Sequence, residues 1–192
     1  MSYQTVIVLD FGGQYKELIA RRVRECGVYS VILPGDTPIE RIEALSPIGI
    51  ILTGGPNSVY LDGAPRCSRA LFSLGVPILG ICYGLQLMAW STGGTVSPCE
   101  VSEYGRTEMT AEPGCVLFQG LTANQIGLMS HTDRVSALPA GFRSVASTAH
   151  CPNAAMANDE RKLYGLQFHP EVENTPNGTT MIRNFLYRAY HV

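Results

Sequence analysis

Apolar runs alternate with amphipathic stretches along the first half of the chain. Short runs rich in Val, Ile and Leu predict buried strands, and apolar positions three and four residues apart predict helices. We expect strands at residues 5–10, 28–33, 48–52 and 76–81, and helices at residues 14–26, 38–45, 65–74 and 85–90. Continuously apolar strands that alternate with helices are typical of a parallel sheet covered by helices on both faces.

The second half of the chain has short β-rich segments separated by turn residues, and it ends in an amphipathic stretch. We expect strands at residues 95–97, 106–110, 126–130, 141–147, 154–157 and 163–167, and a helix at residues 179–190. No internal repeat, low-complexity segment or linker divides the chain. The pattern therefore predicts one α/β domain over residues 1–192, with an open, mixed and mostly parallel sheet flanked by helices.

Composition and charge narrow the classes of function. Of the 192 residues, 45% are hydrophobic and 16% are charged, which is typical of a globular protein with a real core. The net charge is −2 and no basic run is present, which argues against nucleic acid and against an anionic membrane as partners. The apolar runs are far shorter than the roughly 20 residues that span a bilayer, and the N-terminus lacks the pattern of a signal peptide.

The six cysteines show no CxxC spacing and form no tight sequence cluster with histidine. We therefore expect free thiols and no metal site. Free thiols and the missing signal peptide together predict a cytoplasmic location.

One cysteine, Cys82, lies at the junction between an expected strand and an expected helix. It is the centre of the segment Gly80-Ile81-Cys82-Tyr83-Gly84. A nucleophile on such a sharp strand-to-helix turn is held in a strained backbone conformation and is exposed at the edge of the sheet, an arrangement called a nucleophile elbow. The flanking glycines avoid a collision between a β-carbon and nearby backbone, and the start of the helix favours a thiolate. The segment therefore predicts a cysteine nucleophile.

A cysteine nucleophile needs a base, and His169 is the expected one. It lies at the end of the strand expected at residues 163–167, and Glu171 follows two positions later. In extended backbone the two side chains leave the same face, so Glu171 can hold one ring nitrogen while the other faces the thiol. The three residue types in this arrangement predict a Cys-His-Glu triad.

The same chemistry needs hydrogen-bond donors for a tetrahedral oxyanion. The backbone N–H of Tyr83, just after the nucleophile, and that of Gly55, in a glycine turn after an expected strand, are the expected donors. Sites in open α/β sheets gather at the carboxyl ends of strands, and Cys82 and His169 also follow expected strands. We therefore expect these groups to converge. For His131 we expect a role in shaping a loop.

Three sequence blocks carry a family resemblance. They are residues 52–56, 80–86 and 167–172, which read LTGGP, GICYGLQ and QFHPEV. With these blocks the chain resembles the class I glutamine amidotransferases, whose Cys-His-Glu glutaminase domain has a flavodoxin-like α/β fold. Further blocks narrow the resemblance to the branch of the family that serves GMP synthesis: residues 8–15, 18–25, 104–108, 129–131 and 182–186. The resemblance covers essentially the whole chain.

The resemblance implies that the substrate is L-glutamine, which is hydrolysed to glutamate and ammonia. It implies that Cys82 attacks the side-chain amide, that His169 protonates the departing ammonia and then activates water against the thioester, and that Glu171 orients His169. It also implies glutamine contacts at Gly54, Gln86, Ser130, Thr132 and Asp133.

Two positions depart from the family pattern. Thr132 stands where the family usually has Gly, and Gly13 stands where Ser is often found. Threonine tolerates fewer backbone conformations than glycine, so the departure at Thr132 bears on the expected glutamine contacts.

The resemblance also implies where the ammonia is used. In this branch it reaches an ATP pyrophosphatase domain or subunit, which uses ATP and Mg²⁺ to adenylylate XMP and then aminates it to GMP. The sequence has neither a P-loop nor a Ser-Gly-Gly-x-Asp-type loop, so we expect no cofactor in this chain. The chain is then either a free-standing glutaminase subunit or one domain of a longer protein, and the sequence leaves both open.

Two other functions fit the sequence less well. The chain could supply ammonia to another acceptor, in anthranilate, aminodeoxychorismate or carbamoyl phosphate synthesis, but the block at residues 8–15 argues against this. It could also be a silent glutamine-binding regulatory module, but the intact Cys82, His169 and Glu171 argue against that.

Overall fold

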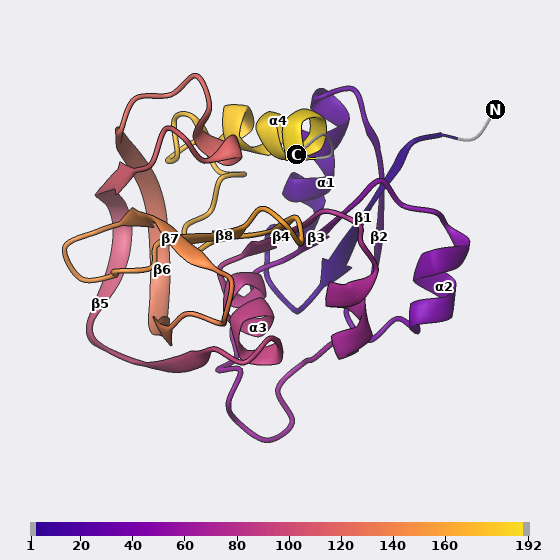
Figure 1. Cartoon of the computed structure of the whole chain (residues 1–192), viewed down its shortest axis with the longest axis horizontal. Coiled ribbons are helices and arrows are strands. Elements are labelled where there is room, and N and C mark those ends of the chain that lie inside the picture. The colour runs from indigo at the N-terminus through magenta and orange to yellow at the C-terminus, as the bar shows by residue number, and fades with distance from the viewer. Residues whose placement is uncertain (1–2, 190–192) are drawn as a thin grey trace.

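One sheet of nine strands runs through residues 3–189, the part of the chain that the computed structural model describes (Figure 1). The strands are β1 (Thr5–Asp10), β2 (Tyr29–Pro34), β3 (Gly49–Leu52), β4 (Ile78–Ile81), β5 (Thr95–Ala111), β6 (Asn124–Ala137), β7 (Arg143–Ser147), β8 (Ala155–Asn158) and β9 (Leu163–Leu166). Their order in the sheet is β2-β1-β3-β4-β9-β8-β7-β5-β6. The pairs from β2 to β9 are parallel, and the pairs from β9 to β6 are antiparallel.

Helices cover both faces of the parallel part of the sheet. They are α1 (Lys16–Glu25), α2 (Ile39–Ala44), α3 (Tyr83–Ser91) and α4 (Gly178–Arg188). Figure 1 shows α1 and α4 above the sheet and α3 below it. Successive side chains of a strand point to opposite faces. Accordingly Val6 and Val8 pack with residues of α1 and α4, whereas Ile7 and Leu9 pack with residues of α3. Burial on both faces explains why β1 is apolar throughout, and it confirms the predicted α/β fold.

The largest difference from the predicted elements lies in the antiparallel half. The short strands expected at residues 95–97 and 106–110 belong to one strand of 17 residues, β5. The strand expected at residues 126–130 is the centre of a strand of 14 residues, β6. These two strands form a long ribbon whose register shifts between Pro98 and Glu103. Polar positions of β5 adopt strand conformation through this pairing, which local propensity does not reveal.

The helix expected at residues 65–74 is mostly absent, and a short 3₁₀ helix, η1 (Arg69–Ser73), takes its place. Tertiary contacts hold the preceding residues in a loop. The Tyr83 hydroxyl donates to the Pro65 carbonyl, and the Arg66 guanidinium stacks on a tryptophan ring at 4.1 Å. These contacts compete with helix formation, so the amphipathic spacing there was misleading.

The turn between β4 and α3 has the geometry predicted for a nucleophile elbow. Cys82 has φ 53° and ψ −108°, a conformation that is costly for a residue with a β-carbon. A β-carbon at Gly80 would lie 2.5 Å from the Gly84 carbonyl oxygen, and one at Gly84 would lie 2.4 Å from the Leu52 carbonyl oxygen. The two glycines therefore permit the close backbone packing that holds Cys82 at the end of β4.

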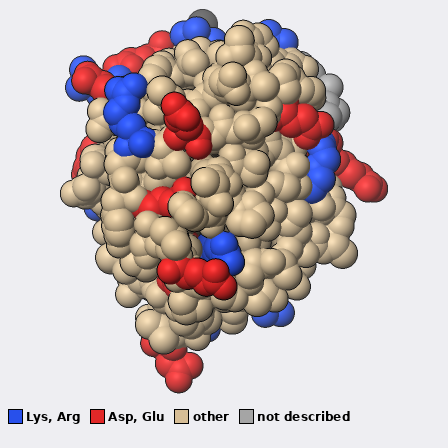
Figure 2. Space-filling view, turned by 90° about the vertical axis from the view of Figure 1, so that its left-hand side faces the viewer, with Lys and Arg blue, Asp and Glu red and all other residues tan. Residues whose placement is uncertain are grey.

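The remaining predicted elements match to within a few residues, and the last residue of the helix expected at 179–190 lies outside the described part of the chain. No helix within residues 3–189 is both long and apolar enough to cross a membrane. On the side of the molecule that carries β5 and β6, charged side chains of both signs stand in small separate groups (Figure 2).

Candidate active site

Three neighbouring parallel strands end at one edge of the sheet and carry the residues predicted for the site. Gly54 follows β3, Cys82 follows β4 and His169 follows β9, and these strands are adjacent in the sheet. A β-carbon at Gly54 would lie 3.1 Å from the His169 Cε1 atom and 3.5 Å from the Cys82 Cβ atom. The fold thus brings the three segments into contact, although 115 residues separate Gly54 from His169 in the sequence.

The Cys82 thiol lies among three polar groups. The residue is 7% exposed, and its side chain lies beside the His169 imidazole in the same cavity. The Gln167 Nε2 atom lies 3.7 Å from the sulfur, and the Ser130 carbonyl oxygen lies 3.8 Å from it. The sulfur therefore has a base on one side and fixed polar groups on the others. Sequence reasoning did not assign Gln167 to the site.

His169 is held between the thiol and a buried carboxylate. Its Nδ1 atom lies 2.7 Å from Glu171 Oε1, which leaves Nε2 for the thiol. Burial opposes the charged imidazolium, but hydrogen bonds with Cys82 and Glu171 outweigh it and raise the pKa of His169 to about 10. The imidazolium is therefore the favoured form at neutral pH. A cation beside a sulfur atom is the arrangement that activates thiol nucleophiles.

Contacts that sequence reasoning did not assign fix the His169–Glu171 segment. The Thr175 hydroxyl donates to the His169 carbonyl at 2.6 Å, and Arg22 Nε donates to the Glu171 carbonyl at 2.9 Å. The Tyr15 ring meets the imidazole edge-on, with 5.6 Å between the ring centres. Tyr15 and Arg22 lie in the family blocks at residues 8–15 and 18–25. The sequence therefore singled out these blocks, but only the fold shows that they contact the His169–Glu171 segment.

Two cavities meet at Cys82. The larger cavity, of about 550 Å³, is also lined by Tyr15, Gly54, His169 and Glu171. The smaller cavity, of about 240 Å³, is also lined by Gln86, Ser130, Thr132 and Asp133. Four of the five predicted glutamine contacts thus surround the smaller cavity, whereas Gly54 lines the larger one.

The predicted oxyanion donors, Gly55 and Tyr83, both line the smaller cavity beside the nucleophile. Within residues 3–189, no protein group accepts a hydrogen bond from either backbone N–H. A β-carbon at Gly55 would lie 2.4 Å from the Phe11 carbonyl oxygen, so the turn needs glycine at this position. Two uncommitted N–H donors beside a thiol are suited to an oxyanion.

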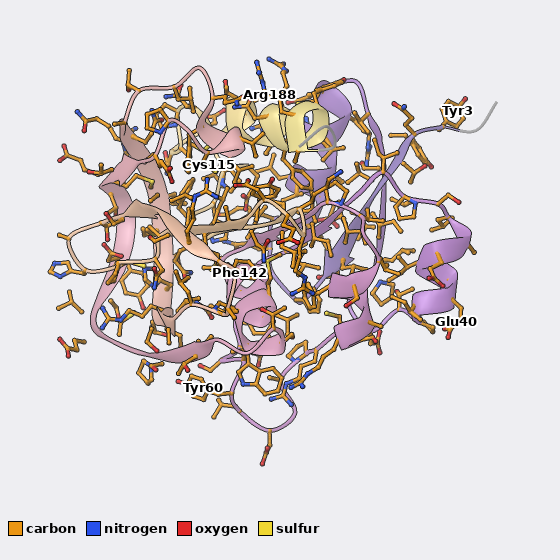
Figure 3. All side chains as sticks on the ribbon, in the orientation of Figure 1. Tyr3, Glu40, Tyr60, Cys115, Phe142 and Arg188 are labelled. Carbon is orange, nitrogen blue, oxygen red and sulfur yellow. The ribbon has the colours of Figure 1, made fainter. Side chains whose placement is uncertain are left out.

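Gln86 and Asp133 form the polar wall of the smaller cavity. Gln86 Nε2 donates to the Asp133 carbonyl at 3.0 Å and to Gln167 Oε1 at 3.1 Å. The Asp133 carboxylate accepts hydrogen bonds from Ser58 Oγ at 2.5 Å and from the Tyr60 hydroxyl at 2.8 Å. Tyr60 lies on the loop after β3, at the edge of the molecule (Figure 3). The carboxylate is therefore oriented by two hydroxyl groups from a separate loop.

The two departures from the family pattern have different consequences. Thr132 is an exposed residue of β6 between buried His131 and buried Asp133, and its φ lies outside the left-handed region. The extended backbone there suits a β-branched residue, so glycine is not required. At Gly13 a β-carbon would lie 2.5 Å from the Gly54 carbonyl oxygen, so glycine allows this loop to approach the site closely.

Comparison with known proteins agrees with the fold and with the three sequence blocks. Residues 7–189 match the family model for glutamine amidotransferase class-I. The chain belongs to the class I glutamine amidotransferases. It is 56% identical over 182 residues to GMP synthase [glutamine-hydrolyzing] from Clostridium perfringens and 53% identical over 186 residues to that from Caldanaerobacter subterraneus. These matches cover 95% and 97% of this chain but 36% of each relative, so the chain spans about a third of their length.

Solved structures show the same architecture. A structure from Thermoplasma acidophilum, assigned to one subunit of a GMP synthase, has a TM-score of 0.85 and 32% identity, and the match covers 97% of this chain and 94% of that one. A glutamine amidotransferase from Thermotoga maritima has a TM-score of 0.76 with full coverage of both chains. Its identity of 17% limits that similarity to the fold.

Proposed function

We propose that residues 1–192 form a glutaminase domain that hydrolyses L-glutamine to glutamate and ammonia. One arrangement carries this proposal: a cysteine on a strained elbow lines the same cavity as an imidazole whose Nδ1 atom lies 2.7 Å from a buried carboxylate. This is the order of nucleophile, base and orienting group that acyl transfer requires. The family to which the chain belongs supplies the substrate class.

The proposed reaction begins when the Cys82 sulfur, with its proton held by His169, attacks the side-chain amide carbon of glutamine. The oxyanion that forms accepts hydrogen bonds from the backbone N–H groups of Gly55 and Tyr83, and losing one such donor costs about 3 kcal/mol of transition-state stabilisation. The carbon–nitrogen bond then breaks, His169 gives its proton to the departing nitrogen, and ammonia leaves a glutamyl thioester on Cys82.

Hydrolysis of the thioester completes the proposed cycle. A water molecule loses a proton to His169 and attacks the thioester carbonyl carbon. The same two N–H donors stabilise the second oxyanion. When the carbon–sulfur bond breaks, the product leaves as glutamate after its new carboxyl group loses a proton to solvent. The proton that His169 took from water stays on the imidazole, so the thiolate beside protonated His169 is the starting state again. Glu171 keeps the imidazole in the tautomer that both half-reactions need.

The smaller cavity is the proposed site for glutamine. Its volume of about 240 Å³ and its polar wall suit a short polar substrate, and the Asp133 carboxylate provides a negative charge for the α-ammonium group of an amino acid. Gln86 Nε2 donates hydrogen bonds to the Asp133 carbonyl and to Gln167 Oε1, and these bonds fix the orientation of the amide. The Gln86 amide oxygen is then available to accept a hydrogen bond from the substrate. Ser130 and Thr132 complete the wall, and Gly54 backs the nucleophile from the side of the larger cavity.

We further propose that the ammonia is delivered to an ATP pyrophosphatase domain or subunit that aminates XMP to GMP in the cytoplasm. Support comes from the relatives, which are GMP synthases about three times as long as the matched region. ATP and Mg²⁺ would act in that partner, because residues 1–192 include no nucleotide-binding loop.

Glutamate release by this chain alone is expected to be slow. We expect it to rise at least about tenfold when the ATP pyrophosphatase domain of a GMP synthase is added with ATP, Mg²⁺ and XMP, since family members couple glutamine hydrolysis to an ammonia acceptor. Glutamate can be measured with glutamate dehydrogenase, in the presence and absence of each component. Cys82→Ala in the complete mixture is the control and is expected to release no glutamate while ammonium salts still support GMP formation. Fast turnover without the partner, or stimulation by an anthranilate synthase component instead, would contradict the proposed partner.

A further inference from the structure

A second buried acid–imidazole pair lies next to the smaller cavity. Glu103 of β5 and His131 of β6 face each other across the ribbon, and Glu103 Oε1 lies 3.0 Å from His131 Nε2. The two side chains are 5% and 1% exposed. The proposed reaction uses neither of them. Burial removes both groups from water, and this desolvation has an unfavourable free energy. The other contacts of the pair therefore indicate its role.

The imidazole of this pair connects to the proposed glutamine site. His131 Nδ1 lies 2.8 Å from the Asp133 carbonyl oxygen, the same oxygen that accepts a hydrogen bond from Gln86 Nε2. Gln86 Nε2 also donates to Gln167, whose own amide nitrogen lies 3.7 Å from the Cys82 sulfur. A line of buried hydrogen bonds therefore runs from the Glu103–His131 pair to the nucleophile.

The carboxylate of the pair is anchored on the opposite side. The Thr148 hydroxyl, between β7 and β8, donates to Glu103 Oε2 at 2.6 Å. Thr148 Oγ1 also accepts a hydrogen bond from the Cys151 backbone N–H at 2.9 Å. Both carboxylate oxygens of Glu103 are thus engaged, and the imidazole is held in one orientation toward Asp133.

We propose that the Glu103–His131 pair is a positioning device for glutamine recognition, which fixes the Asp133 carbonyl and, with it, the Asp133 carboxylate and the Gln86 amide. The inference rests on the proposed function and deepens it. The Asp133 carbonyl is buried and accepts two hydrogen bonds, so loss of the one from His131 lets the peptide unit rotate and displaces both groups. Because the reacting atoms lie at Cys82, the effect falls on substrate binding and not on the chemical step.

A metal site is the other role that these residue types suggest. Among the described residues, Glu103, His131 and Cys151 place ligand atoms within 4.8 Å of one another. The hydrogen bonds argue against a metal, because Glu103 Oε1 and the Asp133 carbonyl oxygen already engage the two ring nitrogens of His131. Burial also raises the pKa of the Cys151 thiol to about 12, which disfavours the thiolate that a metal would need.

Two substitutions at His131 separate the roles of its nitrogens. The side-chain amide of His131→Asn reaches the position of Nδ1, and that of His131→Gln reaches the position of Nε2. In steady-state assays of glutamate release, we expect His131→Gln to raise KM for glutamine about tenfold or more while kcat stays within about threefold. We expect His131→Asn to stay within about threefold of the wild type in both constants. Glu103→Gln is a second variant, for the case in which His131→Gln does not fold, and it keeps the shape of the Glu103 side chain. We expect Glu103→Gln to raise KM for glutamine about threefold to tenfold.

Asn184→Leu is the matched control for loss of buried hydrogen bonds. Asn184 donates to the Leu117 and Gln119 carbonyls, away from both cavities, so its loss is expected to lower Tm without changing KM. An unchanged KM in His131→Gln and Glu103→Gln, with normal wild-type turnover, would overturn this inference alone, as would a loss confined to kcat. Stoichiometric zinc that is lost in Cys151→Ala would also overturn it. A wild type without turnover would overturn the proposed function as well.

Discussion

Replacing Cys82 with alanine is expected to lower glutamate release by at least about 10⁴-fold, because the thioester pathway has no other nucleophile. Cys82 lines both cavities and shares the larger one with His169. The measurement is single-turnover and steady-state glutamate release from glutamine, with circular dichroism to show that the variant is folded.

Two further variants show whether this loss is specific to the elbow. Cys115→Ala removes another buried cysteine, in the core beside α4, and is expected to lower stability while glutamate release per folded molecule is kept. Cys82→Gly removes the nucleophile together with the strain of φ 53°, so we expect it to be about 1 kcal/mol more stable than Cys82→Ala in urea unfolding. Equal stability of the two variants would contradict the strained conformation, and residual glutamate release in both would contradict the role of the sulfur.

His169→Asn is expected to lower glutamate release by about 10³-fold or more. The substitution removes the group that takes the proton from the thiol, returns it to the departing ammonia and later activates water. We expect the thiol of this variant to react more slowly with iodoacetamide at neutral pH, because the imidazolium beside the sulfur is lost. His150→Asn is the matched control, since His150 is exposed, and its rates are expected to equal those of the wild type. Glutamate release by His169→Asn at a rate close to that of the wild type would contradict the triad.

The pH dependence gives this prediction a second, independent measurement. Burial opposes the charge on His169, and hydrogen bonds with Cys82 and Glu171 raise its pKa to about 10. The imidazolium is therefore present below that pH and is lost above it, so activity is expected to fall on the alkaline side. Glu171→Gln removes one of the two groups that raise the pKa, and it should move the alkaline limb of the kcat/KM profile to lower pH. A limb that does not move would contradict the assignment of Glu171.

The sequence predicted the parts of the fold in which each segment carries its own signal. The strands of the parallel half are buried on both faces, so their apolar runs identify them without knowledge of their partners. Gly80 and Gly84 mark the elbow in the same way, because the clashes that they avoid involve residues of the turn itself and of the adjacent strand β3. His169 and Glu171 are two residues apart, and their contact also needs only local geometry.

The parts that the sequence did not predict depend on pairing between distant segments. The polar middle of β5 becomes a strand because it pairs with β6, and the register of that ribbon decides that Glu103 meets His131. At residues 65–74 the sequence pattern predicted a helix, but tertiary contacts of Pro65 and Arg66 hold the start of this segment in a loop. Thr132 was a departure with an unknown consequence until its extended conformation in β6 was seen.

The proposed mechanism requires a glutamyl thioester on Cys82, and rapid-quench peptide mass spectrometry can detect this intermediate. The chain is mixed with glutamine, stopped in acid at successive times and digested, and the peptide that contains Cys82 is examined for an added glutamyl group. We predict that this adduct forms and decays in step with glutamate release in the wild type, and that it is absent in Cys82→Ala. Glutamate release with no adduct on Cys82, or with an adduct on another residue, would contradict the mechanism.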